Sequence, residues 1–128
     1  MTEPKWLSPS FIISLHEILI SQHGGSSGVR DEGLLDSALT KPVQTHHYKP
    51  MPIPELAAAY AVGIIQNHPF VDGNKRTGFV AAATFMEING FELTASEVDA
   101  TLATLALAAG EMTQEEYAAW LVKNSQAQ

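Results

Sequence analysis

The residues best suited to chemistry are gathered in one short segment, from His68 to Arg76. The segment contains a histidine, an aspartate, a glycine and two adjacent cations, in a chain of 128 residues of which only 16% are charged. Long and nearly uncharged helical patterns flank it, Pro54 to Gln66 before it and Phe79 to Ile88 after it. The polar chemistry of this chain is therefore concentrated at the junction of two predicted helices.

The two cations of this segment lie where a helix alone would not favour them. Pro69 and Gly73 interrupt the helical pattern and Asn74 is a good N-cap, so we expect Lys75 and Arg76 in the first turn of the second helix. The positive end of the helix dipole and unpaired backbone N–H groups lie there, and a cation costs roughly a few tenths of a kcal/mol. Free N–H groups, an accessible backbone and two cations are what a bound phosphate requires. The pattern predicts a phosphate-binding helix N-terminus.

His68 and Asp72 supply the other groups that a phosphate-transfer site needs. Histidine titrates near neutral pH and can take a proton from a hydroxyl, and a carboxylate beside bound phosphates commonly holds a magnesium ion. The two residues are four positions apart around a tight loop, so both can face one ligand. Each also has a purely structural interpretation, His68 as a helix C-cap and Asp72 as a turn residue before glycine. The misplaced cations beside them favour the functional interpretation.

The sequence HPFVDGNKR resembles the signature of the Fic/Doc superfamily, His-x-Phe-x-(Asp/Glu/Asn)-(Gly/Ala)-Asn-(Gly/Lys)-Arg. Residues 24–38 and 105–112 resemble the death-on-curing branch of that superfamily, so the resemblance covers most of the chain. It implies that His68 is the base acting on a target hydroxyl and that Asp72 is a magnesium ligand. It also implies phosphate contacts from Asn74, Lys75 and Arg76, access to them across Gly73, and a buried anchor at Phe70.

Two positions of the resemblance bear on the reaction. AMP-transferases of the superfamily have Gly where this chain has Lys75, and a second Arg where it has Phe79; the death-on-curing branch has Lys at the first position. The resemblance to that branch implies a protein kinase that presents the γ-phosphate of ATP. Adenylyl transfer stays open, because Gly73 matches the AMP-transferase form and Gln66 is neutral where Arg would be a further phosphate ligand. A non-enzymatic interaction module with a degenerate anion site is a third interpretation.

The resemblance also implies partners and a setting. It indicates ATP and Mg²⁺ as substrate and cofactor, and a toxin that arrests translation by modifying a threonine of elongation factor Tu. The self-inhibitory pattern of the superfamily, (Ser/Thr)-x-x-x-Glu-(Gly/Asn), is absent from this sequence. Inhibition is therefore expected from another chain, a Phd-like antitoxin whose disordered tail folds onto the toxin. The expected setting is a bacterial cytoplasm, with the gene in the bacterium or in a phage.

The bulk composition limits the other classes of function. A chain of 128 residues is expected to form one domain, residues 1–128, with a sizeable core. The absence of cysteine excludes disulfides and thiolate metal sites and is compatible with a reducing compartment. A net charge of −7 argues against direct binding of nucleic acid or of anionic membranes. We find no leader pattern and no apolar stretch that could span a bilayer, and we expect a cytoplasmic protein.

Periodicity, capping residues and breaks predict about six helices in an all-α, single-domain orthogonal bundle. The expected helices run from Pro9 to Gly24, from Asp31 to Lys41, from Glu55 to Gln66, from Asn74 to Asn89, from a cap at Thr94 or Ser96 to Gly110, and from a capping box at Thr113 to a frayed tail that begins at Ser125. Residues 91–93 form a short extended connection. Helix 74–89 is apolar nearly all round, so it should be the buried central helix.

The connections and helix faces are also predicted. Residues 24–28 should be a flexible connection, and Pro42 should end the second helix, leaving an exposed loop to Pro54. The resemblance implies that residues 43–53 form a flap that aligns the target peptide. His16 and Glu17 are expected on a solvated helix face. Two stripes are predicted to be buried, one formed by Phe11, Leu15, Ile18 and Leu19, and the other by Val98, Leu102, Leu105 and Ala109.

Overall fold

Six helices and one small sheet make up the computed structural model, which describes residues 3–128. The helices are α1 (Pro9–His23), α2 (Glu32–Tyr48), α3 (Ile53–Asn67), α4 (Asn74–Ile88), α5 (Glu97–Ala108) and α6 (Gln114–Lys123). The strands β1 (Phe91–Leu93) and β2 (Ser125–Ala127) pair antiparallel, with Glu92 opposite Gln126. The predicted all-α class and the extended connection at residues 91–93 are confirmed. The predicted frayed tail is wrong, because residues 125–127 form β2.

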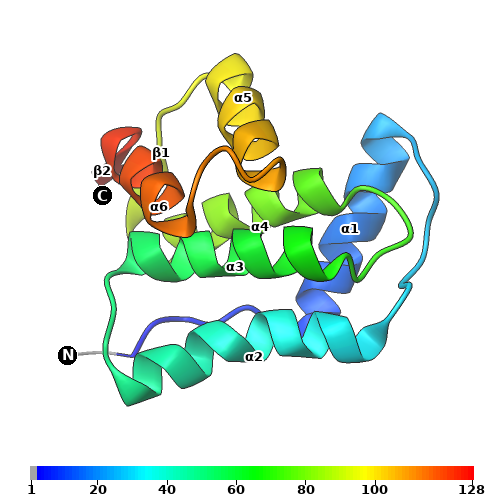
Figure 1. The fold of residues 1–128 in the computed structure, drawn as a ribbon, viewed down its shortest axis with the longest axis horizontal. Coiled ribbons are helices and arrows are strands. Elements are labelled where there is room, and N and C mark those ends of the chain that lie inside the picture. The colour runs from blue at the N-terminus through cyan, green and yellow to red at the C-terminus, as the bar shows by residue number, and fades with distance from the viewer. Residues whose placement is uncertain (1–2) are drawn as a thin grey trace.

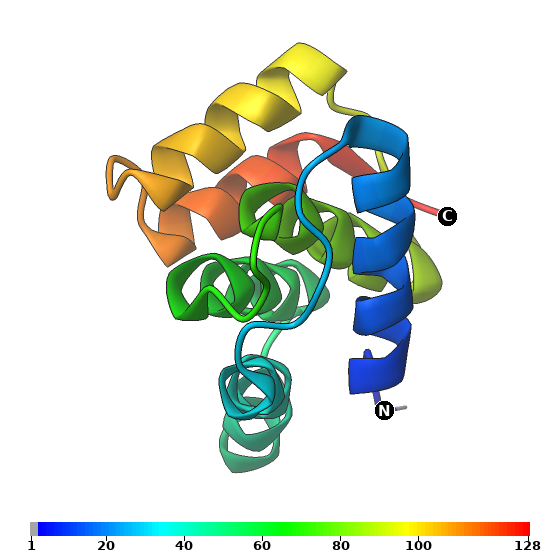
Figure 2. The same cartoon turned by 90° about the vertical axis from the view of Figure 1, so that its right-hand side faces the viewer.

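Helices α3 and α4 form the centre of the bundle, and the other elements surround them (Figure 1). Helix α2 lies along α3 on one side, and α5 and α6 lie on the other. Helix α1 stands across this pair, upright in Figure 2 where α3 is seen end on. A single cluster of buried residues joins segments from Leu7 to Leu121, and Tyr60, Phe85 and Tyr117 are its largest fully buried side chains. The expected orthogonal bundle around a buried helix is confirmed, with α3 sharing the central place.

The predicted helix starts agree with the structure wherever a short polar side chain caps the helix. Ser8, Asp31 and Ser96 each accept a hydrogen bond from the backbone N–H three residues later. Thr113 and Glu116 form the expected capping box. Such caps depend on neighbouring residues alone, so the sequence is sufficient to locate them.

Helix α2 continues far beyond its predicted end at Lys41. Pro42 lies inside the helix and is buried, and the helix ends only at Tyr48. Proline removes one hydrogen bond of the helix, but the packing of its last turns compensates, with Trp6 in edge contact with the rings of His46 and His47. The expected loop from Pro42 to Pro54 is therefore wrong, and only residues 49–52 connect α2 to α3.

The two predicted apolar stripes are mostly wrong. Phe11 and Ile18 are exposed, and α1 instead buries Ile12, His16 and Leu19. On α5 the large residues Val98, Leu102 and Leu105 are exposed, and the buried residues are Ala100, Ala103, Thr104 and Leu107. Both helices have apolar residues on more than one side, so periodicity alone could not choose the face. Within residues 3–128, no helix is both long and apolar enough to cross a membrane.

Gly78 allows α3 and α4 to pack closely near the junction that carries the polar segment. A Cβ atom at Gly78 would lie 2.9 Å from Cγ1 of Ile65 and 3.2 Å from the carbonyl oxygen of Ala61. The second neighbour is backbone and can move only with α3. The separation of the two helices at this point therefore depends on the absence of a side chain.

We predict that Gly78→Ala destabilises the fold by about 1–3 kcal/mol, because overpacking outweighs the gain in helix propensity. The free energy of unfolding in urea measures this effect. Ser37→Ala on the exposed face of α2 is the control, with an expected change within about 0.5 kcal/mol. A Gly78→Ala variant as stable as the parent chain would show that the contact is not constraining.

Candidate functional site

The polar segment forms the loop that joins α3 to α4, and residues 24–31 lie beside it. The backbone N–H groups of Arg30 and Asp31 both donate to the carbonyl oxygen of Pro69, at 2.6 and 3.0 Å. The N–H of Val71 donates to the carbonyl oxygen of Gly28 at 3.1 Å. Figure 2 shows this stretch running in front of the α3–α4 junction. The connection at residues 24–28 is thus hydrogen-bonded to the loop, through the carbonyl oxygen of Gly28 and through the N–H of Ser26, which donates to Oδ2 of Asp72.

His68 ends α3 as its C-cap, in the left-handed backbone conformation with φ 52°. The structural interpretation of this histidine is therefore correct, and His68 also lines a cavity beside α5. A left-handed conformation is strained for a residue with a Cβ atom. Strained residues persist where surrounding contacts hold them, and such a contact is present here.

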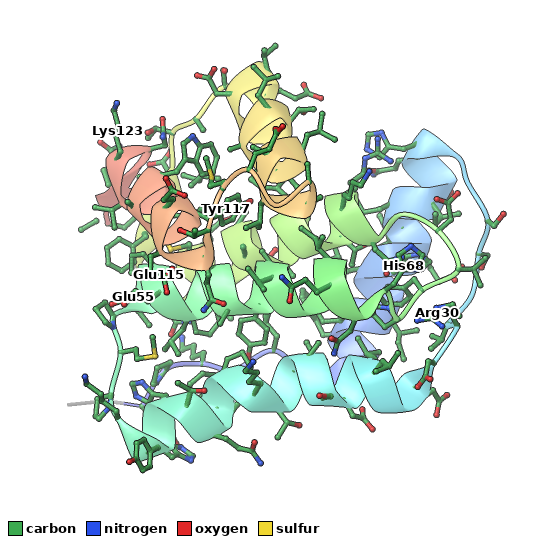
Figure 3. All side chains as sticks on the ribbon, viewed as in Figure 1. Arg30, Glu55, His68, Glu115, Tyr117 and Lys123 are labelled. Atoms are coloured by element: carbon green, nitrogen blue, oxygen red, sulfur yellow. The ribbon has the colours of Figure 1, made fainter. Side chains whose placement is uncertain are left out.

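Arg30 provides that contact from the segment between α1 and α2. Its Nε atom donates to the carbonyl oxygen of His68 at 2.7 Å, and Nη2 donates to the carbonyl oxygen of Asn67 at 3.0 Å. These carbonyl groups lie at the negative end of the α3 dipole, where a cation is favoured. Figure 3 shows Arg30 beside His68. The sequence analysis missed Arg30, because its partners are backbone atoms of a distant segment.

Asp72 is held as an ionised carboxylate at the edge of the cavity. Its Oδ1 accepts from the N–H of Gly73 at 2.8 Å, and its Oδ2 accepts from the N–H of Ser26 at 3.2 Å. These two hydrogen bonds, from Ser26 first, lower the pKa of Asp72 below its ordinary value, and the nearby His16 and His68 add to the effect. The carboxylate leaves no room at Gly25, where a Cβ atom would lie 2.7 Å from Oδ2.

The N-terminus of α4 presents backbone donors that lack an acceptor within the described residues 3–128. Its N-cap is Gly73, with φ 78°, which has no side chain that could cap the helix. Among residues 3–128, the backbone N–H groups of residues 74, 75 and 76 have no acceptor, whereas the N–H of Thr77 donates to Gly73. Lys75 and Arg76 are exposed on the same turn. This is the arrangement of donors and charge that suits an anion.

Asn74 is not the N-cap that the sequence predicts. It is the first residue of α4, and its buried amide faces the loop, where Oδ1 accepts from the N–H of Phe70 and Nδ2 donates to the carbonyl oxygen of Phe70, both at 3.0 Å. Both ends of its side-chain amide therefore bind the loop, and its backbone N–H is available to a phosphate. Phe70 itself is fully buried, as an anchor should be.

A cavity of about 860 Å³ brings the predicted polar residues together between the α3–α4 junction and α5. Its wall includes six of the seven residues that the sequence singles out: His68, Asp72, Gly73, Asn74, Lys75 and Arg76. Phe79 lines it too, and α5 contributes an opposite side through Ala100, Thr104, Leu105 and Ala108. The remaining residue, Phe70, belongs to the same loop, but its side chain is fully buried and does not line the cavity.

The cavity has the groups needed to hold magnesium together with phosphates. Asp72 is exposed and charged, and each of its oxygens retains a lone pair after its hydrogen bond to the backbone. Residues 3–128 contain no group of three or more histidine and acidic side chains that would bind a metal by themselves. A single carboxylate fits a magnesium ion that takes its other ligands from substrate phosphates and water.

The residues expected to form a flap lie elsewhere. Residues 43–48 are helical, and the connection at residues 49–52 is at the opposite end of α3 from His68, as Figure 1 shows. Helix α3 has 15 residues, which corresponds to about 20 Å. The segment beside His68 is instead residues 28–31.

Comparison with known proteins identifies relatives of this chain. The sequence model of the Fic/DOC family matches residues 6–86. A protein of Mycolicibacterium smegmatis named Toxin Doc is 48% identical over 75 residues, which are 56% of this chain and 57% of that protein. A protein of Escherichia phage P1 named Protein kinase doc is 32% identical over 108 residues, which are 84% of this chain and 85% of that protein. The match thus spans little more than half of the first relative and most of the second.

We predict that Arg30→Met lowers the free energy of unfolding by about 1–2 kcal/mol, because it removes two charge-assisted hydrogen bonds and leaves a strained C-cap. Urea denaturation measures the change. Arg76→Met is the matched control, since Arg76 is also exposed and its side chain forms no hydrogen bond or ion pair with any residue from 3 to 128. Equal effects of the two substitutions would contradict the role assigned to Arg30.

The lowered pKa of Asp72 predicts a contribution to stability that depends on pH. A carboxyl group whose pKa is lower in the folded state stabilises the fold above its unfolded pKa of about 3.9, and this stabilisation is lost as pH falls through the folded value. We expect the parent chain to lose more stability than Asp72→Asn between neutral pH and the acid side of that range. Unfolding free energies measured across this range, with Asp36→Asn on the exposed face of α2 as control, test it. Parallel pH profiles for the parent chain and Asp72→Asn would contradict the prediction.

Proposed function

Since the chain belongs to the Fic/DOC family, we propose that it is a toxin that acts as a protein kinase, transferring the γ-phosphate of ATP to a hydroxyl group of a protein target. The observation that carries this proposal is the convergence of a histidine, an ionised carboxylate and the open N-terminus of α4 on one cavity. The phage relative named Protein kinase doc, which is similar over most of its length, supports the same class of reaction.

In the proposed reaction, the residues of the loop and of α4 have different roles. His68 accepts the proton of the target hydroxyl while that oxygen forms a bond to the γ-phosphorus. The bond between the γ-phosphorus and the bridging oxygen breaks, and ADP leaves. The N–H groups of residues 74–76, with Lys75 and Arg76, hold the phosphate oxygens. A magnesium ion held by Asp72 and the phosphates would neutralise part of their charge.

Lys75 and Phe79 favour phosphoryl over adenylyl transfer. Both line the cavity, so both bear on how a nucleotide lies in it. Lys75 adds a charged side chain where AMP-transferases of the superfamily have only glycine, and Phe79 removes a cation that those enzymes use. The chain therefore has one phosphate-binding arginine after the loop, Arg76, together with a lysine suited to a terminal phosphate.

The proposed partners follow from the same family membership. We take as target a threonine of elongation factor Tu, whose modification would arrest translation, and as inhibitor a Phd-like antitoxin. The exposed apolar residues Val98, Leu102 and Leu105 on α5 support an inhibitor that covers part of this helix, because Leu105 also lines the cavity. A segment bound there would lie at the rim of the nucleotide site.

ATP labelled separately at the α- and γ-phosphates distinguishes the reactions. We expect the purified chain, with magnesium and a bacterial extract or purified elongation factor Tu, to place γ-label and not α-label on a protein band. His68→Ala should reduce the rate by about 10²–10⁴-fold, which is the usual contribution of a general base. His47→Ala is the matched control, because His47 lies at the end of α2 away from the cavity.

The other outcomes separate the alternatives. Transfer of the α-label would establish an AMP-transferase that uses His68 in spite of Lys75, and it would overturn the kinase proposal. Toxicity in cells that survives His68→Ala, without nucleotide binding by the parent chain, would favour an interaction module. Mass spectrometry of the labelled band then shows which hydroxyl carries the group.

A further inference from the structure

His16 is a buried histidine to which the proposed reaction assigns no part. It lies on α1, is almost completely inaccessible to solvent, and was expected on a solvated face. Its Nε2 atom is 2.7 Å from the carbonyl oxygen of Asp72. Because a carbonyl oxygen can only accept, Nε2 carries the proton and donates it. A buried imidazole is costly unless it is hydrogen-bonded, so this contact explains why the ring is tolerated there.

The ring of His16 also packs against the α3–α4 loop. It stacks on the ring of Phe70, with centroids 3.9 Å apart and planes 6° from parallel. The adjacent Glu17 accepts hydrogen bonds from the hydroxyl of Ser27, at 2.6 and 2.9 Å to its two oxygens. The Asp72 carboxylate is bound between the α3–α4 loop and the segment that contains Ser26 and Ser27. His16 therefore holds the first of these segments, and the adjacent Glu17 holds the second. Helix α1 serves as a fixed support for this side of the cavity.

The hydrogen bond from His16 determines the direction of one peptide group. In a trans peptide the C=O and N–H bonds point in opposite directions. With the carbonyl of Asp72 directed at His16, the N–H of Gly73 is directed away from α1, and there it donates to Oδ1 of Asp72 at 2.8 Å. Gly73 tolerates a wide range of φ, so its backbone alone would not keep this peptide from rotating.

We propose that His16 is a positioning residue for the Asp72 carboxylate, acting through the Asp72–Gly73 peptide, and that it sets the metal-dependent part of nucleotide binding. The inference rests on the proposed function in taking Asp72 as the magnesium ligand. The N–H groups of residues 74–76 that are proposed to bind phosphate are held by α4 itself and by the two hydrogen bonds between Asn74 and Phe70, which do not involve the hydrogen bond from His16. Loss of the His16 contact should therefore weaken magnesium-assisted binding and leave metal-free binding largely unchanged.

Replacement by phenylalanine and by glutamine separates the hydrogen bond from the packing. His16→Phe keeps an aromatic ring against Phe70 but has no donor, whereas the amide nitrogen of His16→Gln is as many bonds from Cα as Nε2 and can donate to Asp72. Calorimetry with ADP, in magnesium and in EDTA, gives the two affinities. We expect His16→Phe to lose about 10–100-fold in magnesium-dependent affinity, the usual effect of removing a group that orients a metal ligand. His16→Gln should bind more like the parent chain, and Asp72→Asn marks complete loss of the metal-dependent part.

A second pair of variants keeps the proposal testable if the phenylalanine variant does not fold. His16→Asn is polar, like His16→Gln, but its side chain is one carbon too short for its amide to reach the Asp72 carbonyl. Only the glutamine variant should retain magnesium-dependent affinity. The amide proton resonance of Gly73 reports the same peptide without any ligand, and it should move further in the asparagine and phenylalanine variants than in the glutamine variant.

The outcomes for His16 and for the proposed function can be told apart. If folded His16→Phe or His16→Asn binds magnesium and ADP as the parent chain does, or if the Gly73 resonance is unchanged, the assignment to His16 is overturned. Equal losses with and without magnesium would likewise overturn it, since they would indicate general damage to the cavity. A parent chain that binds no nucleotide and transfers no phosphate refutes the proposed function, while the Gly73 resonance still tests the orientation of the peptide.

Discussion

The open N-terminus of α4 is the constraint on which the rest of the site depends. Three N–H groups that have no acceptor within residues 3–128 stand with two cations at the positive end of a helix, an arrangement that does not stabilise the free protein. Two carbonyl groups of the loop before it do not serve as acceptors for these N–H groups, because they accept hydrogen bonds from other side chains. The carbonyl of Phe70 binds Asn74, and the carbonyl of Asp72 binds His16. The open helix end lowers the stability of the free protein, and the same unpaired donors suit the anion that we propose to bind there.

An open helix end of this kind must be held by neighbouring elements, and three sets of contacts from two parts of the fold hold it. Residues 28–31 pair with the loop, Arg30 binds the carbonyl groups at the end of α3, and α1 supports the loop through His16. Behind the loop, Gly78 lets α3 and α4 approach closely, which fixes the distance that the loop must span. Each support comes from a rigid helix or from a segment hydrogen-bonded to one. The side chains of the cavity are thereby presented by elements that tertiary packing keeps in place.

The parts of this protein that the sequence predicts are those governed by neighbouring residues. The caps at Ser8, Asp31 and Thr113, and the clustering of His68, Asp72 and Lys75 at one helix junction, needed no knowledge of distant contacts. Several of the failures involve partners that are remote in sequence. Pro42 within α2 was tolerated because of tertiary packing, and the roles of His16 and Arg30 depend on backbone atoms roughly 40–60 residues away.

Asn74 shows how a residue can be identified correctly and its role still be misjudged. Its amide would have served equally well as an N-cap, a phosphate ligand or a clasp for the loop, and the sequence does not choose among these uses. The choice follows from Gly73, which adopts a left-handed conformation and becomes the N-cap, so that Asn74 turns inward toward Phe70.

His68 is both a structural C-cap and a residue of the proposed active site. As the C-cap of α3 it must adopt a left-handed conformation, which asparagine or glycine would adopt with less strain. A histidine at this position is therefore not explained by the cap alone. The guanidinium of Arg30 offsets the strain by binding the carbonyl oxygens of Asn67 and His68, and the same turn leaves the imidazole at the cavity wall. The cost in backbone energy thus supports the proposal that the imidazole serves as a base beside the phosphate site.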